Sequence, residues 1–308
     1  MDDSALGLWG VPLAILAGAI RVSTPFIFVS LGETLTERSG RINLGLEGTL
    51  VFGAMAAYAV AVITGSPWAG VAAAMVAGSL FGLLHGFICK FPKVNDIAIG
   101  IAMMQFGLGL AFFFGKPFIQ PVAPKLPVIS LGFWSHLPQI QAALTVNILF
   151  IIGLVLALVL WWALKNTRIG LILRVVGDSS DAARAMGINP DTVRLLATMA
   201  GGALAAVGGA YLSLFYPGSW NERISSGQGL MAVALVIFAR WNPLGCVLAS
   251  LLFGGAGALG PALQSVGVSE GYYLFYAAPY VLTLIILIIT SSPTRALSGA
   301  PAALSLTK

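Results

Sequence analysis

The stretch at residues 142–164, AALTVNILFIIGLVLALVLWWAL, contains no charged side chain, and a lysine follows it directly at position 165. An α-helix rises about 1.5 Å per residue, so this run is long enough to cross the ~30 Å hydrocarbon layer of a bilayer. The strands of a membrane β-barrel are only ~10 residues long and alternate between apolar and polar side chains, which this run does not. It therefore predicts a membrane-spanning helix.

The rest of the chain has the same character. It is 58% hydrophobic and only 9% charged, with a mean hydropathy of +0.94, whereas soluble domains carry about 25% charged residues. We expect one all-α, polytopic membrane domain over residues 1–308, with about nine transmembrane helices and a range of eight to ten. The predicted spans are 9–32, 43–64, 67–89, 96–115, 142–164, 192–216, 227–240, 244–261 and 272–291.

Lys and Arg are unevenly distributed among the predicted loops. With the N-terminus outside, the outer segments hold only Lys116, Lys125 and Arg223. The inner segments then hold Arg38, Arg41, Lys90, Lys93, Lys165, Arg168, Arg174, Arg184, Arg194, Arg240, Arg295 and Lys308. Because cytoplasmic loops retain Lys and Arg, we expect an outside N-terminus and a cytoplasmic C-terminus. The net charge of +5 then reflects membrane topology and predicts no binding of nucleic acid.

The longest polar stretch on the predicted cytoplasmic side is residues 165–194. Within it, Asp178-Ser179-Ser180-Asp181 is typical of a helix start, with an acceptor side chain followed three residues later by an acid. Good helix formers follow, and Gly187 favours a left-handed helix end. We expect a short helix from Asp178 to Gly187. The residues alone leave open whether it docks onto a partner or merely connects two spans.

Small residues recur every four positions in two of the predicted spans. These stripes are Gly70, Ala74, Gly78, Gly82 and Gly86 in the third span and Gly201, Ala205 and Gly209 in the sixth. Residues four apart share one helix face, and small side chains allow two helix backbones to approach closely. We interpret both stripes as helix-packing surfaces.

Polar groups within predicted spans are candidates for a solute pathway because they are costly in hydrocarbon. Arg21 lies four residues before Pro25, and it either binds solute or neutralises a carboxylate of a neighbouring helix. Asn43 and Glu47 share one face of the second span. Because glycines surround these two residues, we expect the helix to be broken there. Gln105 lies near the middle of the fourth span and needs a neighbouring helix, a water molecule or a solute as partner.

The sequence lacks the residue patterns that ATP binding, metal binding and catalysis require. There is no phosphate-binding G-x-x-x-x-G-K-[ST] loop, so the chain itself is not expected to bind ATP or another cofactor. The two histidines, His85 and His136, form no spaced metal motif, and no catalytic constellation accompanies them. Cys89 and Cys246 lie in or beside hydrophobic runs and are interpreted as small apolar residues. We expect no catalytic residue and no metal site.

Several segments resemble a known family of membrane proteins. GLILRVVGDSSDAARAMGI at 170–188 resembles the cytoplasmic coupling segment of permease subunits in bacterial ABC importers for sugars, amino acids and nucleosides. ETLTERSGRINLGLEGT at 33–49 is most similar to the nucleoside permeases that work with basic-membrane-protein-type binding proteins, whereas ribose-type permeases have a pattern closer to GIDLSVG. Further matches are TPF at 24–26, VNDIAIG at 94–100 and RWNPLG at 240–245.

This resemblance implies the fold and the function of an ABC importer permease in the bacterial plasma (inner) membrane. It implies that Asp178, Ala182, Ala183, Arg184 and Gly187 belong to a helix that docks onto a cytoplasmic ATPase, which binds ATP and Mg. It also implies a second, related permease subunit, an extracytoplasmic binding protein, and a solute that is most simply a nucleoside.

Three alternatives remain at this stage. A ribose-type sugar permease would differ in solute. An ion-driven secondary transporter would show inverted repeats, and an intramembrane enzyme would need a catalytic constellation; neither feature is found in the sequence.

Overall fold

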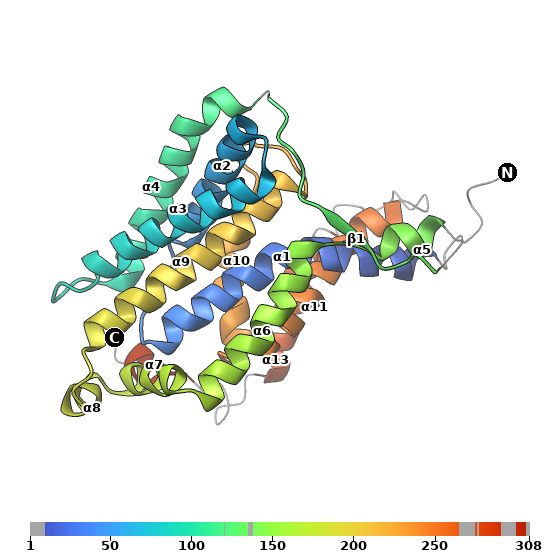
Figure 1. Cartoon of the computed structure of the whole chain (residues 1–308). Helices are drawn as coiled ribbons and strands as arrows, with labels where there is room; N and C mark the ends of the chain where they lie inside the picture. Colours follow the sequence, from blue (N-terminus) through green and yellow to red (C-terminus); the bar gives the residue numbers. More distant parts are fainter. Residues whose placement is uncertain are drawn as a thin grey trace.

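The computed structural model describes residues 10–119, 121–134, 138–264, 275, 277–290 and 300–305. The described part is mainly helical, as the composition predicts (Figure 1). The longer helices are α1 (Gly10–Arg38), α2 (Leu46–Thr64), α3 (Pro67–Ile88), α4 (Asp96–Gly115), α6 (Ile148–Asn166), α9 (Pro190–Leu214), α10 (Gln228–Phe238), α11 (Pro243–Gln264) and α13 (Ala278–Thr290). Each of the nine predicted spans overlaps one of these helices in the described residues.

Seven of the described helices are long and apolar enough to cross a membrane: α1, α2, α3, α4, α6, α9 and α11. Helix α10 has 11 residues and measures about 16 Å, so it crosses only half of the ~30 Å layer. Helix α13 covers the described part of the ninth predicted span, and residues 265–274 lie outside the described part.

Helix α9 is the centre of the bundle, and α1, α2 and α3 pack directly against it. The small-residue stripes predicted from the sequence form these contacts. A Cβ atom on Gly78 of α3 would lie only 2.2 Å from the Gly202 carbonyl oxygen of α9, so both positions require glycine. In contrast with the buried helices α2 and α9, α4 and α6 are largely exposed.

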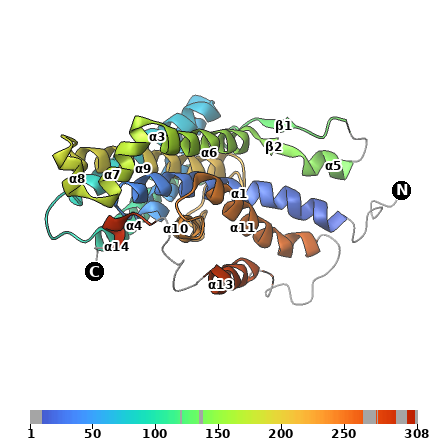
Figure 2. The ribbon, with the colours of Figure 1, turned by 90° about the horizontal axis from the view of Figure 1, so that it is seen from below.

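The two ends of the bundle carry different kinds of structure. One end carries the short helices α7 (Arg168–Asp178), α8 (Ser180–Ala185) and α14 (Ala302–Ser305) (Figure 1). The N-terminal end of α1, the strands and α5 (Pro138–Ala143) lie at the opposite end, and a view from below shows the same separation (Figure 2). The described C-terminal residues are therefore at the α8 end and the start of α1 is at the other.

One small β-hairpin is the only sheet in the described residues. Strands β1 (Val128–Ser130) and β2 (Thr145–Asn147) pair antiparallel, with Ile129 opposite Val146. The predicted span 142–164 therefore begins later, at Ile148, where the Asn147 side chain caps α6 by accepting from the Leu149 N–H group at 2.9 Å. A short 3-10 helix, η2 (Lys116–Phe118), continues α4.

Candidate functional site

Helix α2 begins inside the bundle instead of at its surface. Residues 41–45 are not helical and run beside the first half of α4, where Leu44 packs against Gly100 and Gly48 against Met104. Met104 lies eight residues after the start of α4, about 12 Å along that helix. Helix α2 is then continuous from Leu46 to Thr64, so the break expected in the predicted span 43–64 is a later helix start, preceded by non-helical backbone that is largely buried in protein.

Helix α10 begins beside the start of α2, and Glu47 joins the two helix starts. Its Oε1 atom accepts from the Gly227 N–H group at 2.9 Å and from the Ser225 hydroxyl, and its Oε2 atom accepts from the Gly229 N–H group at 2.6 Å. Gly227 is the N-cap residue of α10, and no side chain of the segment preceding α10 caps the helix. A carboxylate from α2 therefore satisfies the free N–H groups and the positive end of α10. We call residues 43–49 and 225–229 the α2–α10 junction.

Asn43 completes the junction on the α1 side. Its backbone N–H donates to Glu33 Oε1 at 2.8 Å, and its side-chain Oδ1 accepts from the Gly45 N–H at 2.9 Å. Asn43 is only 2% exposed and Glu47 only 6%. Both side chains hold the starts of α2 and α10 in place, and neither side chain is accessible to a solute.

The other two predicted pathway residues lie elsewhere. Arg21 is half-buried on α1, within electrostatic range of the Tyr211 hydroxyl and 17 residues, or about 25 Å, before the end of that helix at Arg38. Gln105 is exposed, whereas the buried face of α4 contains Met103 and Gly107. The structure thus brings Asn43 and Glu47 together but not Arg21 or Gln105.

Hydrogen bonds link the C-terminal end of α10 to the C-terminal end of α1. The indole N–H of Trp241 donates to Glu37 Oε2, and Arg38 donates through Nε and Nη2 to the Trp241 carbonyl oxygen at 3.2 and 3.1 Å. Arg240 and Trp241 have positive φ angles of 53° and 55°, a strained conformation for residues with a side chain. These contacts fix the turn between α10 and α11 to the end of the bundle that carries α8.

The predicted cytoplasmic helix is present as α8, with one correction to its start. Asp178 is the last residue of α7, and the cap is Ser179, whose Oγ accepts from the Ala182 N–H at 3.2 Å. The capping pattern was assigned one residue too early because α7 continues through Asp178. The predicted end is confirmed: Gly187 has a φ of 76° and its N–H donates to the Arg184 carbonyl at 3.0 Å.

The exposed side of α8 also differs from expectation. Ala183 is fully buried against its own chain, so it is not available to a partner. Ala182, Arg184 and Ala185 are exposed, and Met186 adds an apolar side chain that is 61% exposed. We call Ala182, Arg184, Ala185 and Met186 the α8 outer face. It combines small residues with one large apolar side chain, which suits close docking.

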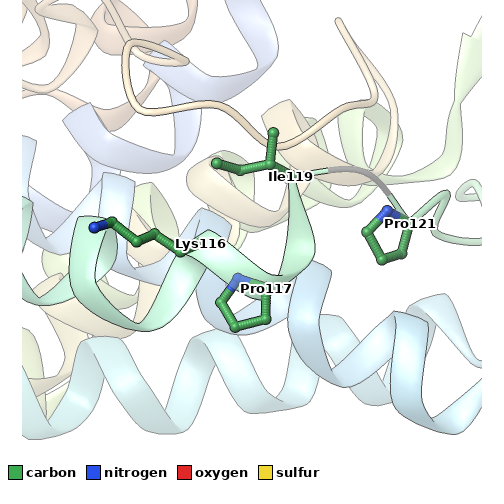
Figure 3. Close-up of a pocket in the computed structure, with 4 residues that line it drawn as sticks. All are labelled: Lys116, Pro117, Ile119 and Pro121. Carbon is green, nitrogen blue, oxygen red and sulfur yellow. The ribbon is translucent and has the colours of Figure 1, made fainter.

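A shallow depression at the opposite end of the bundle does not form a binding site. It is lined by Lys116, Pro117, Ile119 and Pro121. The four side chains point in different directions, and the Lys116 amine is directed away from Pro121 (Figure 3). Polar groups that converge on one ligand are characteristic of solute sites and are missing among these described residues.

Sequence reasoning missed the partners of Glu47 and those of the α1 end. Ser225, Gly227 and Gly229 lie about 180 residues from Glu47, and no spacing rule links them. Trp241 and Glu37 both occur in segments singled out by resemblance, but nothing in either segment indicates that they pair. His136 lies outside the described residues.

Comparison with known proteins finds relatives that are similar to this chain over most of its length. Three relatives are a nucleoside ABC transporter permease protein of Lactococcus lactis, a guanosine ABC transporter permease protein of Bacillus subtilis and a putative glucose ABC transporter permease protein of Haloferax volcanii. Their identities are 30%, 31% and 31%, covering 89%, 89% and 83% of this chain and 90%, 91% and 79% of the respective relative.

A family model described as the branched-chain amino acid transport system / permease component matches residues 15–291. This range contains the α2–α10 junction, the α8 outer face and all seven of the long described helices except the first residues of α1. The chain therefore belongs to the branched-chain amino acid transport system / permease component family, and it is a membrane-spanning permease subunit of an ABC transporter.

Proposed function

We propose that this chain lines half of the pathway through which an ABC importer carries a nucleoside into the cell. The observation that carries this proposal is its similarity to a nucleoside permease and a guanosine permease over about nine-tenths of both chains. Energy comes from a partner ATPase that binds ATP and Mg, since permease subunits of this family do not hydrolyse ATP themselves.

The α2–α10 junction supports an uncharged polar solute. The start of a half-helix within a membrane is a favourable place for an anionic group, such as the carboxylate of an amino acid. Here the Glu47 carboxylate already occupies that position and accepts from Ser225, Gly227 and Gly229. Because this helix start is already filled and buried, it offers no site to an anionic solute, whereas a nucleoside carries hydroxyl and base groups without a net charge.

The pathway in this proposal runs between two permease subunits. Gln105 lies on the exposed face of α4 and offers an amide toward such an interface, while Arg21 contributes nearer the end that carries the N-terminal residues of α1. Asn43 and Glu47 contribute by shaping the junction. The second subunit is a related but different chain, so the pair is a heterodimer.

The two ends of the bundle receive different partners. The α8 outer face docks onto the ATPase, with Arg184 adding an electrostatic contact, while Asp178, Ala183 and Gly187 hold the helix in place. The loops at 116–141 and 217–226 receive the extracytoplasmic binding protein. This arrangement requires an outside N-terminus and a cytoplasmic C-terminus, which the distribution of Lys and Arg favours.

A sugar is the second candidate, because one relative of similar identity is a putative glucose permease. Uptake by cells with and without the gene separates the two. We expect deletion to abolish uptake of labelled guanosine or uridine, and unlabelled glucose not to compete in wild-type cells. Intact nucleoside uptake together with lost uptake of glucose, or of a branched-chain amino acid, would contradict the nucleoside proposal.

A further inference from the structure

Arg194 lies in the second turn of α9, at the end of the bundle that carries α8. Its half-buried guanidinium reaches out of its own helix to three separate pieces of chain. These are the turn between α1 and α2, the last turn of α7 and the first residue of α8. An arginine is suited to this position because its planar group presents several donors at fixed angles.

The contacts of Arg194 are specific. Its Nε atom donates to the Ser39 carbonyl oxygen at 3.0 Å, and its Nη2 atom donates to the Ser180 hydroxyl at 2.9 Å and to the Val176 carbonyl oxygen at 3.4 Å. Ser39 follows α1 directly and Val176 lies near the end of α7, so both carbonyls belong to the negative ends of helices. Arg194 thus links α1, α7 and α8 through charge-assisted hydrogen bonds.

The backbones of the linked segments also touch. A Cβ atom on Gly177 of α7 would lie 2.1 Å from the Arg38 carbonyl oxygen, which means that α7 and the end of α1 are in direct contact. Residues of the α1–α2 turn continue the connection inward. Arg41 pairs with Asp96 of α4 at 2.6 Å, and Asn43 donates to Glu33 beside the α2–α10 junction.

We propose that Arg194 is a positioning residue that transmits the displacement of α8 to the α1–α2 turn and from there to the start of α2. This inference rests on the proposed docking of α8 onto the ATPase. Without the Arg194 contacts, α8 still presents its outer face to the ATPase, but its movement reaches α1 only through the backbone contact at Gly177 and is passed on less completely. The chain then binds the ATPase and permits hydrolysis but moves less solute per ATP.

The test compares variants in proteoliposomes that contain the complete importer, measuring solute transported per ATP hydrolysed. We expect Arg194→Ala to co-purify with the ATPase and to hydrolyse ATP within about twofold of wild type, yet to transport about tenfold less solute per ATP, as loss of hydrogen bonds to a charged group predicts. Arg194→Lys should give an intermediate ratio of solute to ATP, because the lysine ammonium reaches one acceptor but lacks the several fixed donors of the guanidinium group.

Arg174→Ala is the matched control. Arg174 lies on α7, and its Nε donates at 3.4 Å to the carbonyl of Gly170 in the same helix, so its loss removes a like charge near Arg38 but breaks no hydrogen bond between segments. The Arg174 variant should keep the wild-type ratio of solute to ATP. A wild-type ratio in Arg194→Ala would overturn the inference.

Two further variants separate folding and docking from transmission. If Arg194→Ala does not fold, Ser180→Ala and Arg194→Lys decide, and wild-type ratios in both would overturn the inference. Ala182→Trp tests the docking of α8 itself. Normal ATPase binding and transport in Ala182→Trp would contradict the proposed function, whereas loss of binding there with a normal ratio in Arg194→Ala would contradict only the role of Arg194.

Discussion

At the scale of single residues, Glu47 links two helices through one buried carboxylate. Its carboxylate accepts from two N–H groups and a hydroxyl, all belonging to the start of another helix. Replacing it by Gln exchanges one acceptor oxygen for an NH2 group, which leaves at least one buried donor without a partner. Such a loss costs about 1–3 kcal/mol. We expect Glu47→Gln to lower the thermal unfolding temperature of the purified permease in detergent.

Glu222 provides the control for this measurement because it is an acidic residue exposed at the surface of the same loop region. Glu222→Gln should leave the unfolding temperature unchanged. Equal unfolding temperatures for wild type and Glu47→Gln would show that the carboxylate does not stabilise the start of α10.

The two cysteines should be unreactive in the folded protein. Both are buried, and burial together with the nearby Asp96 carboxylate raises the pKa of the Cys89 thiol to about 12. Since only the thiolate reacts with maleimides, the raised pKa and the burial of Cys89 both keep it unreactive at neutral pH. Labelling followed by mass spectrometry should modify neither residue until denaturant is added. Rapid labelling of Cys89 in the native permease would contradict the packing around it.

Sequence reasoning at this scale identified polar residues of interest but not their partners. Asn43 and Glu47 were recognisable because polar groups between glycines are unusual within a span. That Glu47 caps α10 depends on a contact across 180 residues, which only the fold creates. Ala183 looked equivalent to Ala182 in sequence, yet the rotation of α8 buries one and exposes the other.

At the scale of elements, α8 allows two neighbouring substitutions to be contrasted. Trp at the exposed position 182 should leave the permease folded and block ATPase docking, because the large side chain holds the two surfaces apart. Trp at the fully buried position 183 should destabilise the permease itself, since overpacking costs about 1–3 kcal/mol or more. Co-purification of the ATPase and the unfolding temperature of the isolated permease separate these effects.

Arg184→Ala is the mild comparison in this series. Arg184 is 60% exposed and pairs at 3.4 Å with Asp181, which is 95% exposed, and pairs of this kind contribute little in water. Its loss should weaken ATPase docking less than Ala182→Trp does. Full ATPase binding by Ala182→Trp would show that the α8 outer face is not the docking surface.

Element boundaries were predictable where hydrophobicity alone sets them and not where tertiary contacts do. Helix α3 begins at Pro67 and ends at Ile88, within one residue of the predicted span, because polar residues at both ends delimit the apolar run. The predicted span 227–240 has 14 residues and is already shorter than a full crossing, and the structure shortens the helix further, to 11 residues. The shortness of α10 depends on the loop before it, which Glu47 and Trp220 hold inside the bundle; the indole N–H of Trp220 donates to the Gly115 carbonyl at 3.0 Å.

At the scale of the whole molecule, the two ends of the helix bundle are expected to face opposite sides of the membrane. The described C-terminal residues lie beside α7, where the Ala302 N–H donates to Asp178 Oδ1 at 3.5 Å, and the start of α1 lies at the opposite end (Figure 1). We expect a cysteine at the exposed position Asp181 to react only with reagents that enter the cytoplasm. A cysteine at the exposed position Ser130 of β1 should react with impermeant maleimide in intact cells.

Because the two native cysteines are buried, they should not be labelled, and the experiment does not require their removal. Labelling of position 181 from outside, or of position 130 only from inside, would invert the topology. The α8 outer face would then lie on the wrong side of the membrane to meet an ATPase.

The central claim is that this permease carries a nucleoside when a partner hydrolyses ATP. The most direct measurement is accumulation of labelled guanosine in proteoliposomes that contain the permease pair and the ATPase, with the binding protein outside and ATP and Mg inside. We predict accumulation that requires ATP, is lost with Ala182→Trp, and is competed by unlabelled nucleosides but not by glucose or leucine. Accumulation that is independent of ATP, or that glucose or leucine abolishes while nucleosides do not, would contradict the account.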